Sequence, residues 1–181
     1  MEQREAEEAL IKKSQLDPKA FKPLYEKYFK RIFLFVLHRV GDRALASDLT
    51  SQVFLKALLN LRKFQFRGLP FSSWLFRIAI NECHDYFRKS SRHRMVALDH
   101  SGVETLYEEL VADAGLQDLH DRLPSLLEEL NEKELVLIEL RYFEQKPFKE
   151  VSEILGITEN HAKVKMYRIL EKLKKKFLSR S

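Results

Sequence analysis

Apolar residues recur mainly three and four positions apart along most of this 181-residue chain, which is the spacing of one face of an α-helix. No segment alternates apolar and polar residues over the length that would predict a half-buried strand. Glycine and proline, the residues that most often interrupt helices, number only five each. The pattern therefore predicts an all-α protein, with helices near residues 4–15, 18–38, 43–61, 72–90, 116–130, 132–143, 147–155 and 158–177.

The helical pattern is interrupted between residues 91 and 115, where the chain is polar and contains two glycines. We interpret this segment as a flexible acidic linker, with a short helix near 104–112, that joins two small helical domains. Residues 1–90 would form the first domain and residues 116–181 the second.

Capping residues support the helix boundaries of the second domain. Asn131 and Glu134 are spaced as a capping box, in which each side chain binds the backbone N–H of the other. Pro147 suits the first turn of a helix, where the missing N–H has no partner to lose. Gly156 suits the end of that helix, and Thr158 can cap the next one.

Charge is distributed unevenly along the chain. The net charge of +5 and the pI of about 9.2 are a mild indication of a polyanionic partner, and an ordinary basic protein would show the same totals. Residues 60–94 and 159–181 each contain eight Lys and Arg residues and two acidic residues, whereas residues 99–121 contain seven acidic residues and no Lys or Arg. The sequence thus predicts two basic regions that flank an acidic one.

Several classes of protein are disfavoured. A single cysteine, Cys83, rules out an internal disulfide and a multi-cysteine zinc site, and it fits a reducing compartment. The N-terminal segment lacks the apolar core of a signal peptide, and no apolar run reaches membrane-spanning length. The one candidate catalytic pair, His84 and Asp85, is adjacent in the sequence. The two side chains would point about 100° apart on a helix, which disfavours a joint catalytic role. We therefore expect a cytoplasmic, nucleoid-associated protein with no membrane insertion, no catalytic residue, no metal and no cofactor.

Residues 147–177 have the arrangement of a helix-turn-helix, with a tight Gly-Ile-Thr turn between a short helix and a longer basic one. The residues of the longer helix that should pack on the domain are Ala162, Met166, Ile169, Leu173 and Phe177. Its other sides carry polar and basic side chains suited to a DNA major groove. The alternative is a solvated basic face on a structural helix; the turn and the cap favour DNA binding.

The helix expected at 72–90 has an aromatic and basic stripe. Its inward face would comprise Leu75, Ala79, Cys83 and Tyr86, and the opposite stripe comprises Trp74, Arg77, Asn81, His84 and Arg88. The residues that precede it include Phe64, Phe66, Arg67 and Phe71. Cations bind phosphates, rings stack on unpaired bases, and an Asn amide can bind the edge of an extruded base. Burial in the core is the favoured alternative for Phe64 and Phe71, and an equal alternative for Trp74.

The helix expected at 43–61 presents apolar residues on two sides. Its inward face would comprise Ala46, Leu49, Val53 and Ala57, and the opposite side comprises Asp48, Gln52, Leu55 and Leu59. Two leucines on an outer face predict a protein interface. Burial of those leucines against another helix of the same domain is an equal alternative.

In these segments the chain resembles the extracytoplasmic-function (ECF) group of bacterial RNA polymerase sigma factors. The segment FKPLYEKY at 21–28 is similar to the opening of that family's region 2, and DLTSQVFLKAL at 48–58 is similar to its clamp-binding helix. The segment WLFRIAIN at 74–81, followed by Asp85 and Arg88, resembles its promoter-melting and minus-10 helix. Residues 135–155 and the segment GITENHAKVKMYRILEKLKK resemble its region 4, which reads the minus-35 element.

The resemblance implies roles for the residues at matching positions. Contacts with the polymerase clamp fall on Asp48, Gln52, Phe54 and Leu55. Contacts with the unpaired minus-10 strand fall on Phe66, Arg67, Trp74, Arg77, Asn81, Asp85 and Arg88. Contacts with the minus-35 duplex fall on Thr158, Asn160, His161, Lys163, Lys165, Arg168 and Lys172.

The function implied by the resemblance is transcription initiation. The expected partners are the clamp and flap of core RNA polymerase, promoter DNA in duplex and single-stranded form, and an anti-sigma factor. Two alternatives differ in class. A stand-alone helix-turn-helix repressor or activator would not need the aromatic and basic cluster at 64–88. An enzyme acting on nucleic acid would need a catalytic motif, and the sequence contains none of the common ones.

Overall fold

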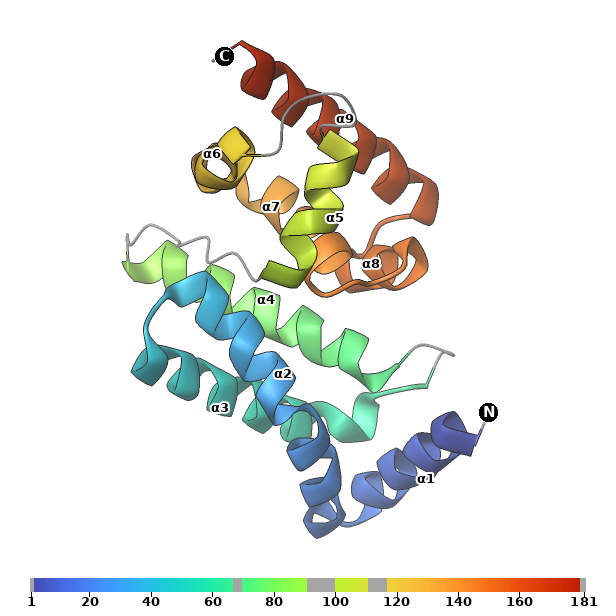
Figure 1. Cartoon of the computed structure of the whole chain (residues 1–181). Helices are drawn as coiled ribbons and strands as arrows, with labels where there is room; N and C mark the ends of the chain where they lie inside the picture. The colour runs from blue at the N-terminus through green and yellow to red at the C-terminus, as the bar shows by residue number, and fades with distance from the viewer. Residues whose placement is uncertain (1, 67–69, 91–99, 111–116, 180–181) are drawn as a thin grey trace. The chain divides into compact units, whose positions relative to one another are not determined.

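The computed structural model describes residues 2–66, 70–90, 100–110 and 117–179, and it divides the chain into two compact units, residues 1–94 and 95–181 (Figure 1). Helices are the regular structure of the described residues, and no strand occurs among them. The prediction of an all-α protein is thereby confirmed. None of the helices in the described ranges has both the length and the hydropathy that crossing a lipid bilayer requires.

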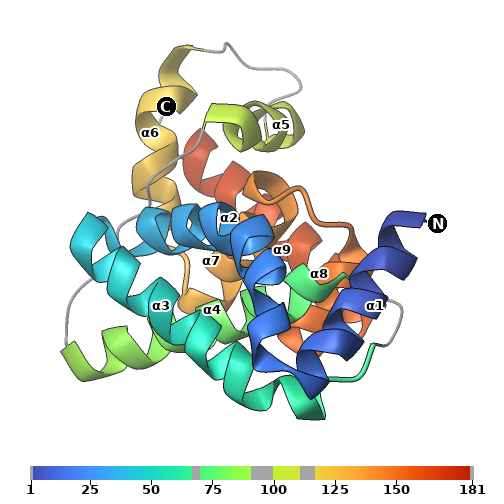
Figure 2. The same ribbon diagram turned by 90° about the horizontal axis from the view of Figure 1, so that it is seen from below.

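The described residues of the first unit form four α-helices and two short 3-10 turns. In chain order these are α1 (Glu2–Leu16), η1 (Pro18–Phe21), α2 (Lys22–Val40), α3 (Arg43–Asn60), η2 (Leu61–Lys63) and α4 (Phe71–Ser90). Helices α2, α3 and α4 pack against one another, and α1 packs against the two 3-10 turns (Figures 1 and 2). The helix expected from residue 18 therefore starts as a 3-10 turn, with Asp17 accepting a hydrogen bond from the Lys19 N–H.

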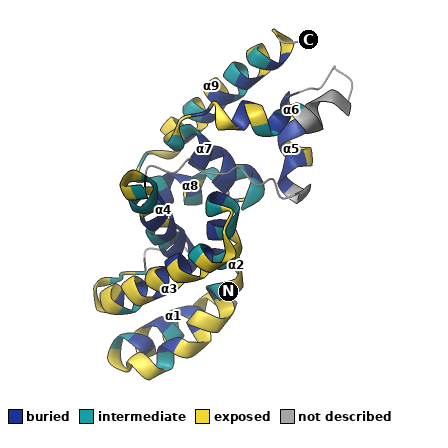
Figure 3. Cartoon of the chain, turned by 90° about the vertical axis from the view of Figure 1, so that its left-hand side faces the viewer, coloured by how far each residue is buried: buried dark blue, intermediate teal, exposed yellow. Residues whose placement is uncertain are grey.

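The core of the first unit forms where the predicted inward faces meet. Ala46, Val53 and Ala57 of α3 are fully buried, as are Leu75, Ala79 and Cys83 of α4. The Phe35 and Phe76 rings meet edge to face between α2 and α4, with centroids 5.1 Å apart. Tyr86, expected on the inward face, is only half-buried. In Figure 3, α3 accordingly shows one buried and one exposed side.

A short link between α2 and α3 sets their antiparallel connection. Gly41 has φ 70°, a left-handed conformation that glycine adopts without a Cβ clash, and its N–H donates to the Leu37 carbonyl. Asp42 then caps α3 by accepting from the Leu45 N–H at 2.9 Å. Two consecutive residues thus end one helix and begin the next.

The second unit contains α5 (His100–Leu110), α6 (Gln117–Glu128), α7 (Glu132–Ile138), the π-helical segment η3 (Glu139–Phe143), α8 (Phe148–Leu155) and α9 (Glu159–Leu178). The capping box of Asn131 and Glu134 is present, with both hydrogen bonds at 3.0 Å. The helix expected at 132–143 begins at this capping box but changes to π-helical hydrogen bonding after Ile138. Gln145, which follows it, has a positive φ of 51°.

Helix α5 lies within the segment that we expected to be a linker. Its buried residues, Val103, Leu106, Tyr107 and Leu110, are spaced as one helical face, and α5 packs on η3 and α9. The Tyr142 hydroxyl of η3 donates a hydrogen bond to the Glu109 carboxylate of α5. Burial raises the pKa of Tyr142, and the Glu109 charge raises it further, so this donor stays protonated. In residues 100–110 the chain is thus part of the second unit's core rather than a solvated connector.

Candidate nucleic-acid and protein interfaces

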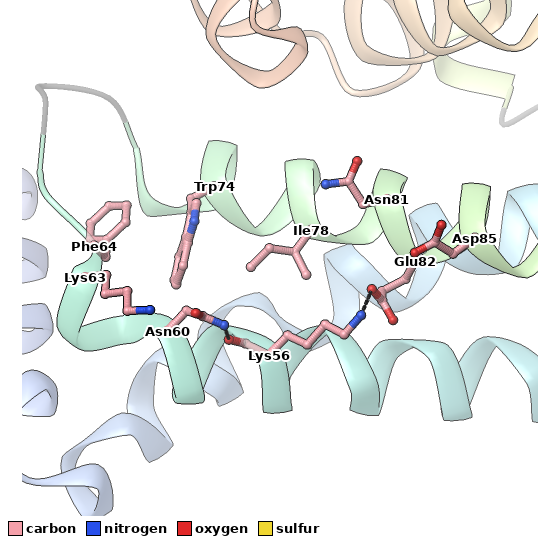
Figure 4. Close-up of a pocket in the computed structure, with 9 residues that line it drawn as sticks. All are labelled: Lys56, Asn60, Lys63, Phe64, Trp74, Ile78, Asn81, Glu82 and Asp85. Carbon is pink, nitrogen blue, oxygen red and sulfur yellow. Dashed lines mark hydrogen bonds and ion pairs between the residues drawn. The ribbon is translucent and has the colours of Figure 1, made fainter.

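A groove of about 510 Å³ runs between α3 and α4 in the first unit (Figure 4). Its α3 side and the turn that follows contribute Lys56, Asn60, Lys63 and Phe64, and its α4 side contributes Trp74, Ile78, Asn81, Glu82 and Asp85. Figure 4 shows Trp74 and Ile78 pointing from α4 toward α3, whereas the Asn81 amide points away from α3. The groove is therefore lined by apolar side chains as well as by polar and charged ones.

An aromatic cluster closes one end of the groove. The Trp74 ring lies 4.8 Å from the Phe64 ring and 5.5 Å from the Phe71 ring, measured between centroids. Phe71 is fully buried, whereas Phe64 and Trp74 are half-buried. The alternative of a core position is thus correct for Phe71. Trp74 and Phe64 keep part of their rings in the groove, where a flat base could stack.

Charges of both signs line the rest of the groove. Lys56 forms an ion pair with the buried Glu82 carboxylate, and Asp85 pairs with Arg88 at 3.0 Å. The Asn60 amide donates to the Lys56 carbonyl at 2.9 Å. Because Lys56 is neutralised in part by Glu82, the groove itself is less basic than the Lys and Arg content of residues 60–94 suggested.

The residues predicted to contact the minus-10 strand do not all gather in one place. Trp74, Asn81 and Asp85 line the groove, whereas Arg77 and Arg88 are exposed on α4 outside its lining. Phe66 is half-buried, and Arg67 lies outside the described residues.

Sequence reasoning missed the α3 wall of the groove. Lys56 and Asn60 lie one helical turn apart on α3, Lys63 follows on η2, and all three line the groove. That spacing was visible in the sequence, but only the pairing of α3 with α4 shows that it lies opposite Trp74 and Asn81.

The predicted polymerase-binding residues divide between the surface and the interior. Asp48, Gln52 and Leu55 are exposed on one side of α3, with Leu59 on the same side and 71% exposed. Phe54 is different, since only 4% of it is exposed. Its ring packs 4.9 Å from Tyr25 and 6.4 Å from Phe21. Phe54 therefore supports this surface from inside and has little area left for a partner.

A second groove of about 460 Å³ adjoins this side of α3. It is mostly apolar and is lined in part by Tyr25, Leu55 and Leu58, with Lys19 and Lys22 also lining it. The exposed leucines thus continue into a concave surface, which favours a protein interface over burial within the unit.

The second unit contains the predicted helix-turn-helix, formed by α8, the turn and α9. Gly156 ends α8 with φ 66°, and Thr158 caps α9 by accepting from the His161 N–H at 3.2 Å. The five residues predicted to face inward on α9 are all buried. Asn160, His161, Lys163 and Arg168 are exposed near its N-terminal half, and Val164 and Tyr167 are exposed beside them.

Two of the lysines predicted to contact duplex DNA are engaged within the second unit. Lys163 pairs with Glu159 at 2.7 Å on the helix surface. Lys172 pairs with Glu134 at 2.8 Å and so ties α9 to the start of α7. Burial raises the pKa of Glu134, but hydrogen bonds from Lys172 and from the Asn131 N–H outweigh it and hold that pKa below its usual value. Lys172 is thus better placed to stabilise the fold than to contact DNA, while Lys165 is partly exposed.

Two family models match the chain. The model for Sigma-70 region 2 matches residues 24–93, and the model for Sigma-70, region 4, matches residues 120–173. Together they match more than half of the chain. The first match includes the α3–α4 groove and the second includes the helix-turn-helix.

Curated relatives match over most of the chain. The ECF RNA polymerase sigma factor BldN of Streptomyces coelicolor is 32% identical over 171 residues, which are 91% of this chain and 63% of that protein. The ECF RNA polymerase sigma factor SigW of Bacillus subtilis is 28% identical over 174 residues, which are 91% of each chain. This chain therefore spans less than two thirds of BldN and nearly the full length of SigW.

Solved structures share the fold. The structure of CnrH in complex with the cytosolic domain of CnrY matches with a TM-score of 0.64 and 19% identity, over 96% of this chain and 97% of that one. The sigma factor RpoE in complex with the anti-sigma factor NepR, from Bartonella quintana, matches with a TM-score of 0.60 and 22% identity, over 87% and 96%.

Proposed function

This chain belongs to the extracytoplasmic-function group of bacterial RNA polymerase sigma factors, and we propose that it directs core polymerase to specific promoters and promotes opening of the DNA there. The observation that carries the proposal is the α3–α4 groove, which lies within the match to region 2 and has half-buried aromatic rings and an exposed Asn. A groove of this kind offers stacking and hydrogen bonds to an unpaired base. A protein that binds only duplex DNA does not need such a groove.

Opening of the promoter would follow from binding free energy alone. An unpaired base that enters the groove would stack on Trp74 and Phe64, while the Asn81 amide, at the outer edge of α4, and the exposed cation of Arg77 would be available to the adjoining part of the strand. These contacts are made only with the separated strand, so they shift the equilibrium toward open DNA. We propose no catalytic residue, because this mechanism makes and breaks no covalent bond.

Polymerase binding is proposed for a neighbouring side of α3. Asp48, Gln52 and Leu55 are exposed there, and the neighbouring apolar groove adds area for the polymerase clamp. Because the same helix also carries Lys56 and Asn60, the clamp interface and the base-binding groove share one rigid support. Docking on polymerase would thereby fix the groove relative to the DNA.

Recognition of the minus-35 element is proposed for α9. Asn160, His161 and Arg168 are exposed where a recognition helix contacts base edges or phosphates, and the helix N-terminus is capped by Thr158. The same unit would contact the polymerase flap. Lys172 is the predicted contact that the structure supports least, since Glu134 holds its ammonium group.

An anti-sigma factor is proposed as a further partner, and the polymerase-bound chain is proposed to act at the nucleoid in the cytoplasm. RpoE of Bartonella quintana was solved in complex with an anti-sigma factor, and this chain shares its fold. We do not retain the alternative of a stand-alone repressor or activator, because it does not explain the match of residues 24–93 to Sigma-70 region 2.

Run-off transcription with purified core polymerase tests the proposal. Pooled genomic fragments serve as templates, and core polymerase without the added chain is the control. We expect initiation at discrete sites only when the chain is present. Unchanged transcription from every template would overturn the proposal.

A further inference from the structure

A glutamine of α1 reaches the aromatic end of the α3–α4 groove. The Gln15 side-chain amide donates one hydrogen bond to the Leu61 carbonyl at 3.0 Å and another to the Phe64 carbonyl at 2.8 Å. The acceptors lie 46 and 49 residues further along the chain, so only tertiary folding brings them to Gln15.

The two acceptors are at the point where helical structure ends. Leu61 begins η2 and Phe64 is its C-terminal cap residue, with φ −67° and ψ 129° in the extended region. The Leu61 carbonyl also accepts a hydrogen bond from the Phe64 N–H at 3.0 Å, so Gln15 adds a second hydrogen bond there and one to the Phe64 carbonyl. An uncharged primary amide can donate two hydrogen bonds, and Gln15 uses both of its donors here. It therefore fixes the backbone direction as the chain leaves η2.

That backbone carries the Phe64 ring, which is the part of the groove wall nearest to Trp74. The Phe64 ring lies 4.8 Å from the Trp74 ring and 5.3 Å from the Phe71 ring. A shift of the Phe64 backbone would move this ring and change the width of the aromatic end of the groove. The hydrogen bonds of Gln15 thus act on the groove through Phe64.

Helix α1 gives Gln15 a fixed support. Ile11 is 2% exposed, and the buried Glu7 carboxylate accepts hydrogen bonds from the Tyr28 hydroxyl and, at 3.3 Å, from the Lys27 ammonium group. Both partners belong to α2. Gln15 follows on the last turn of α1, so the position of its amide is set by the contacts of α1 with the rest of the unit.

We propose that Gln15 is a positioning residue for capture of the unpaired base. It holds the Phe64 backbone so that Phe64 and Trp74 form one stacking wall, and it does not touch the DNA itself. This inference deepens the proposed function and rests on it. It also gives α1, which lies outside the matched residues 24–93, a role in promoter opening.

The first test uses Trp74, which is the only tryptophan of the chain. The variants are Gln15→Ala, which removes both donors, and Gln15→Glu, whose carboxylate would face two carbonyl oxygens. Leu16→Ala is the matched control for Gln15→Ala. Leu16 is 85% exposed at the same helix end, and neither substitution changes the net charge. Thermal unfolding is measured for every variant.

In the full-length protein, both Gln15 variants should shift the tryptophan emission to the red and make it easier to quench with acrylamide. The effect should be larger for Gln15→Glu, because a carboxylate repels the carbonyls instead of binding them. Leu16→Ala should match the wild-type protein. If the Gln15 variants lower only the melting temperature and leave the emission and quenching of Trp74 unchanged, the inference is overturned.

The second test uses the polymerase holoenzyme and a promoter fragment obtained from the run-off assay. The fragment is prepared as a duplex and as a form with mismatched, already unpaired minus-10 bases. Gln15→Ala should bind the unpaired form about tenfold more weakly than the wild-type protein, a change that corresponds to about 1.4 kcal/mol. Its affinity for core polymerase should be unchanged.

The outcomes separate the two proposals. Failure of the wild-type protein to support initiation would overturn the proposed function, and the inference with it. A wild-type protein that initiates, together with a Gln15→Ala variant that binds unpaired DNA as tightly as Leu16→Ala, would overturn the role of Gln15 alone.

Discussion

The side chains that line the α3–α4 groove offer different interactions to an unpaired base. Trp74 and Phe64 present flat rings, which stack on any base with little preference. The amide of Asn81 has donors and an acceptor, so it can distinguish one base edge from another. Among the described residues that line the groove on the α4 side, Asn81 is therefore best suited to read base identity.

Replacing Asn81 with Ala should weaken promoter opening about tenfold. The loss of hydrogen bonds to a base edge costs about 1–1.5 kcal/mol, and about 1.4 kcal/mol corresponds to a factor of ten. Permanganate reactivity of unpaired thymines in holoenzyme–promoter complexes measures the opening. Since Asn81 is exposed, the melting temperature of the protein should change little.

The double variant Asp48→Ala with Gln52→Ala should have the opposite effect. Both side chains are exposed on the side of α3 proposed for the clamp, so affinity for core polymerase should fall. Opening per bound holoenzyme should stay close to that of the wild-type protein. Titration of labelled core polymerase measures the affinity. An equal loss of polymerase affinity in this variant and in Asn81→Ala would contradict the division of roles on α3 and α4.

The ion pair of Glu134 and Lys172 should make stability depend on pH. A carboxyl whose pKa is lower in the folded protein stabilises the fold above its unfolded pKa, and this contribution is lost as the pH falls through the folded pKa. The pKa of Glu134 is lowered from 4.5. Lys172→Met should therefore lower the free energy of unfolding at neutral pH by no more than about 1 kcal/mol, since the pair is partly exposed, and the melting temperature should fall with it.

The control for this prediction is Lys174→Met on the exposed side of α9. Melting temperatures are measured from neutral pH down to pH values below the folded pKa of Glu134. Lys172→Met and the wild-type protein should converge at the acidic end, where Glu134 is protonated and the pair is lost. A difference that stays constant across the whole range would show that the loss comes from packing and not from the ion pair.

Among the helices, α5 packs so closely on η3 that one of its positions, Gly102, has no room for a Cβ atom. A Cβ added to Gly102 would lie 2.5 Å from the Phe143 ring and 2.7 Å from the Tyr142 carbonyl oxygen. The backbone of η3 therefore approaches α5 at a point where only glycine fits. Helix propensity alone would favour alanine at this position by about 1 kcal/mol.

We expect Gly102→Ala to destabilise the protein in spite of that propensity. The clash involves backbone atoms, which cannot rotate away as a flexible side chain would, and overpacking of this kind costs about 1–3 kcal/mol. Thr105→Ala, on the exposed side of α5, is the control and should be neutral or slightly stabilising. Chemical denaturation measures both variants. A stabilised Gly102→Ala variant would mean that α5 does not pack on η3 in this way.

The chain has two units, each with its own core, and each unit carries one of the two proposed DNA-binding surfaces. The helix-turn-helix presents one recognition helix, and base capture in the first unit would need DNA that is already open. A stand-alone repressor instead pairs two recognition helices across a symmetric site. Polymerase would supply the common support.

The free protein should accordingly bind duplex promoter DNA weakly, and the holoenzyme should bind it tightly. Fluorescence anisotropy with a labelled promoter fragment measures both affinities at several salt concentrations. We expect at least a hundredfold difference, about 2.7 kcal/mol, and a decrease of both affinities with salt because Lys and Arg displace counterions from phosphates. Tight and sequence-specific binding by the free chain would instead support a repressor or activator.

Local sequence patterns were sufficient to predict the features that depend on neighbouring residues. Periodicity placed Leu75, Ala79 and Cys83 on one inward face, and capping chemistry placed the boundary at Asn131. The same local signals identified the turn at Gly156 and the buried face of α9. Each of these depends on residues within a few positions of one another, so the helical period and the backbone hydrogen bonds are sufficient to predict it.

Which helix faces meet depends on the folded structure. Phe54 is buried in an aromatic cluster, although the family resemblance implied a contact with polymerase there, and Lys56 and Asn60 lie across the groove from Trp74. The folded structure also packs α5 on the second unit and places the Gln15 amide on the Phe64 carbonyl. These contacts join residues that are far apart in the chain, and their partners are selected by shape, burial and hydrogen-bond geometry, which a local pattern does not contain.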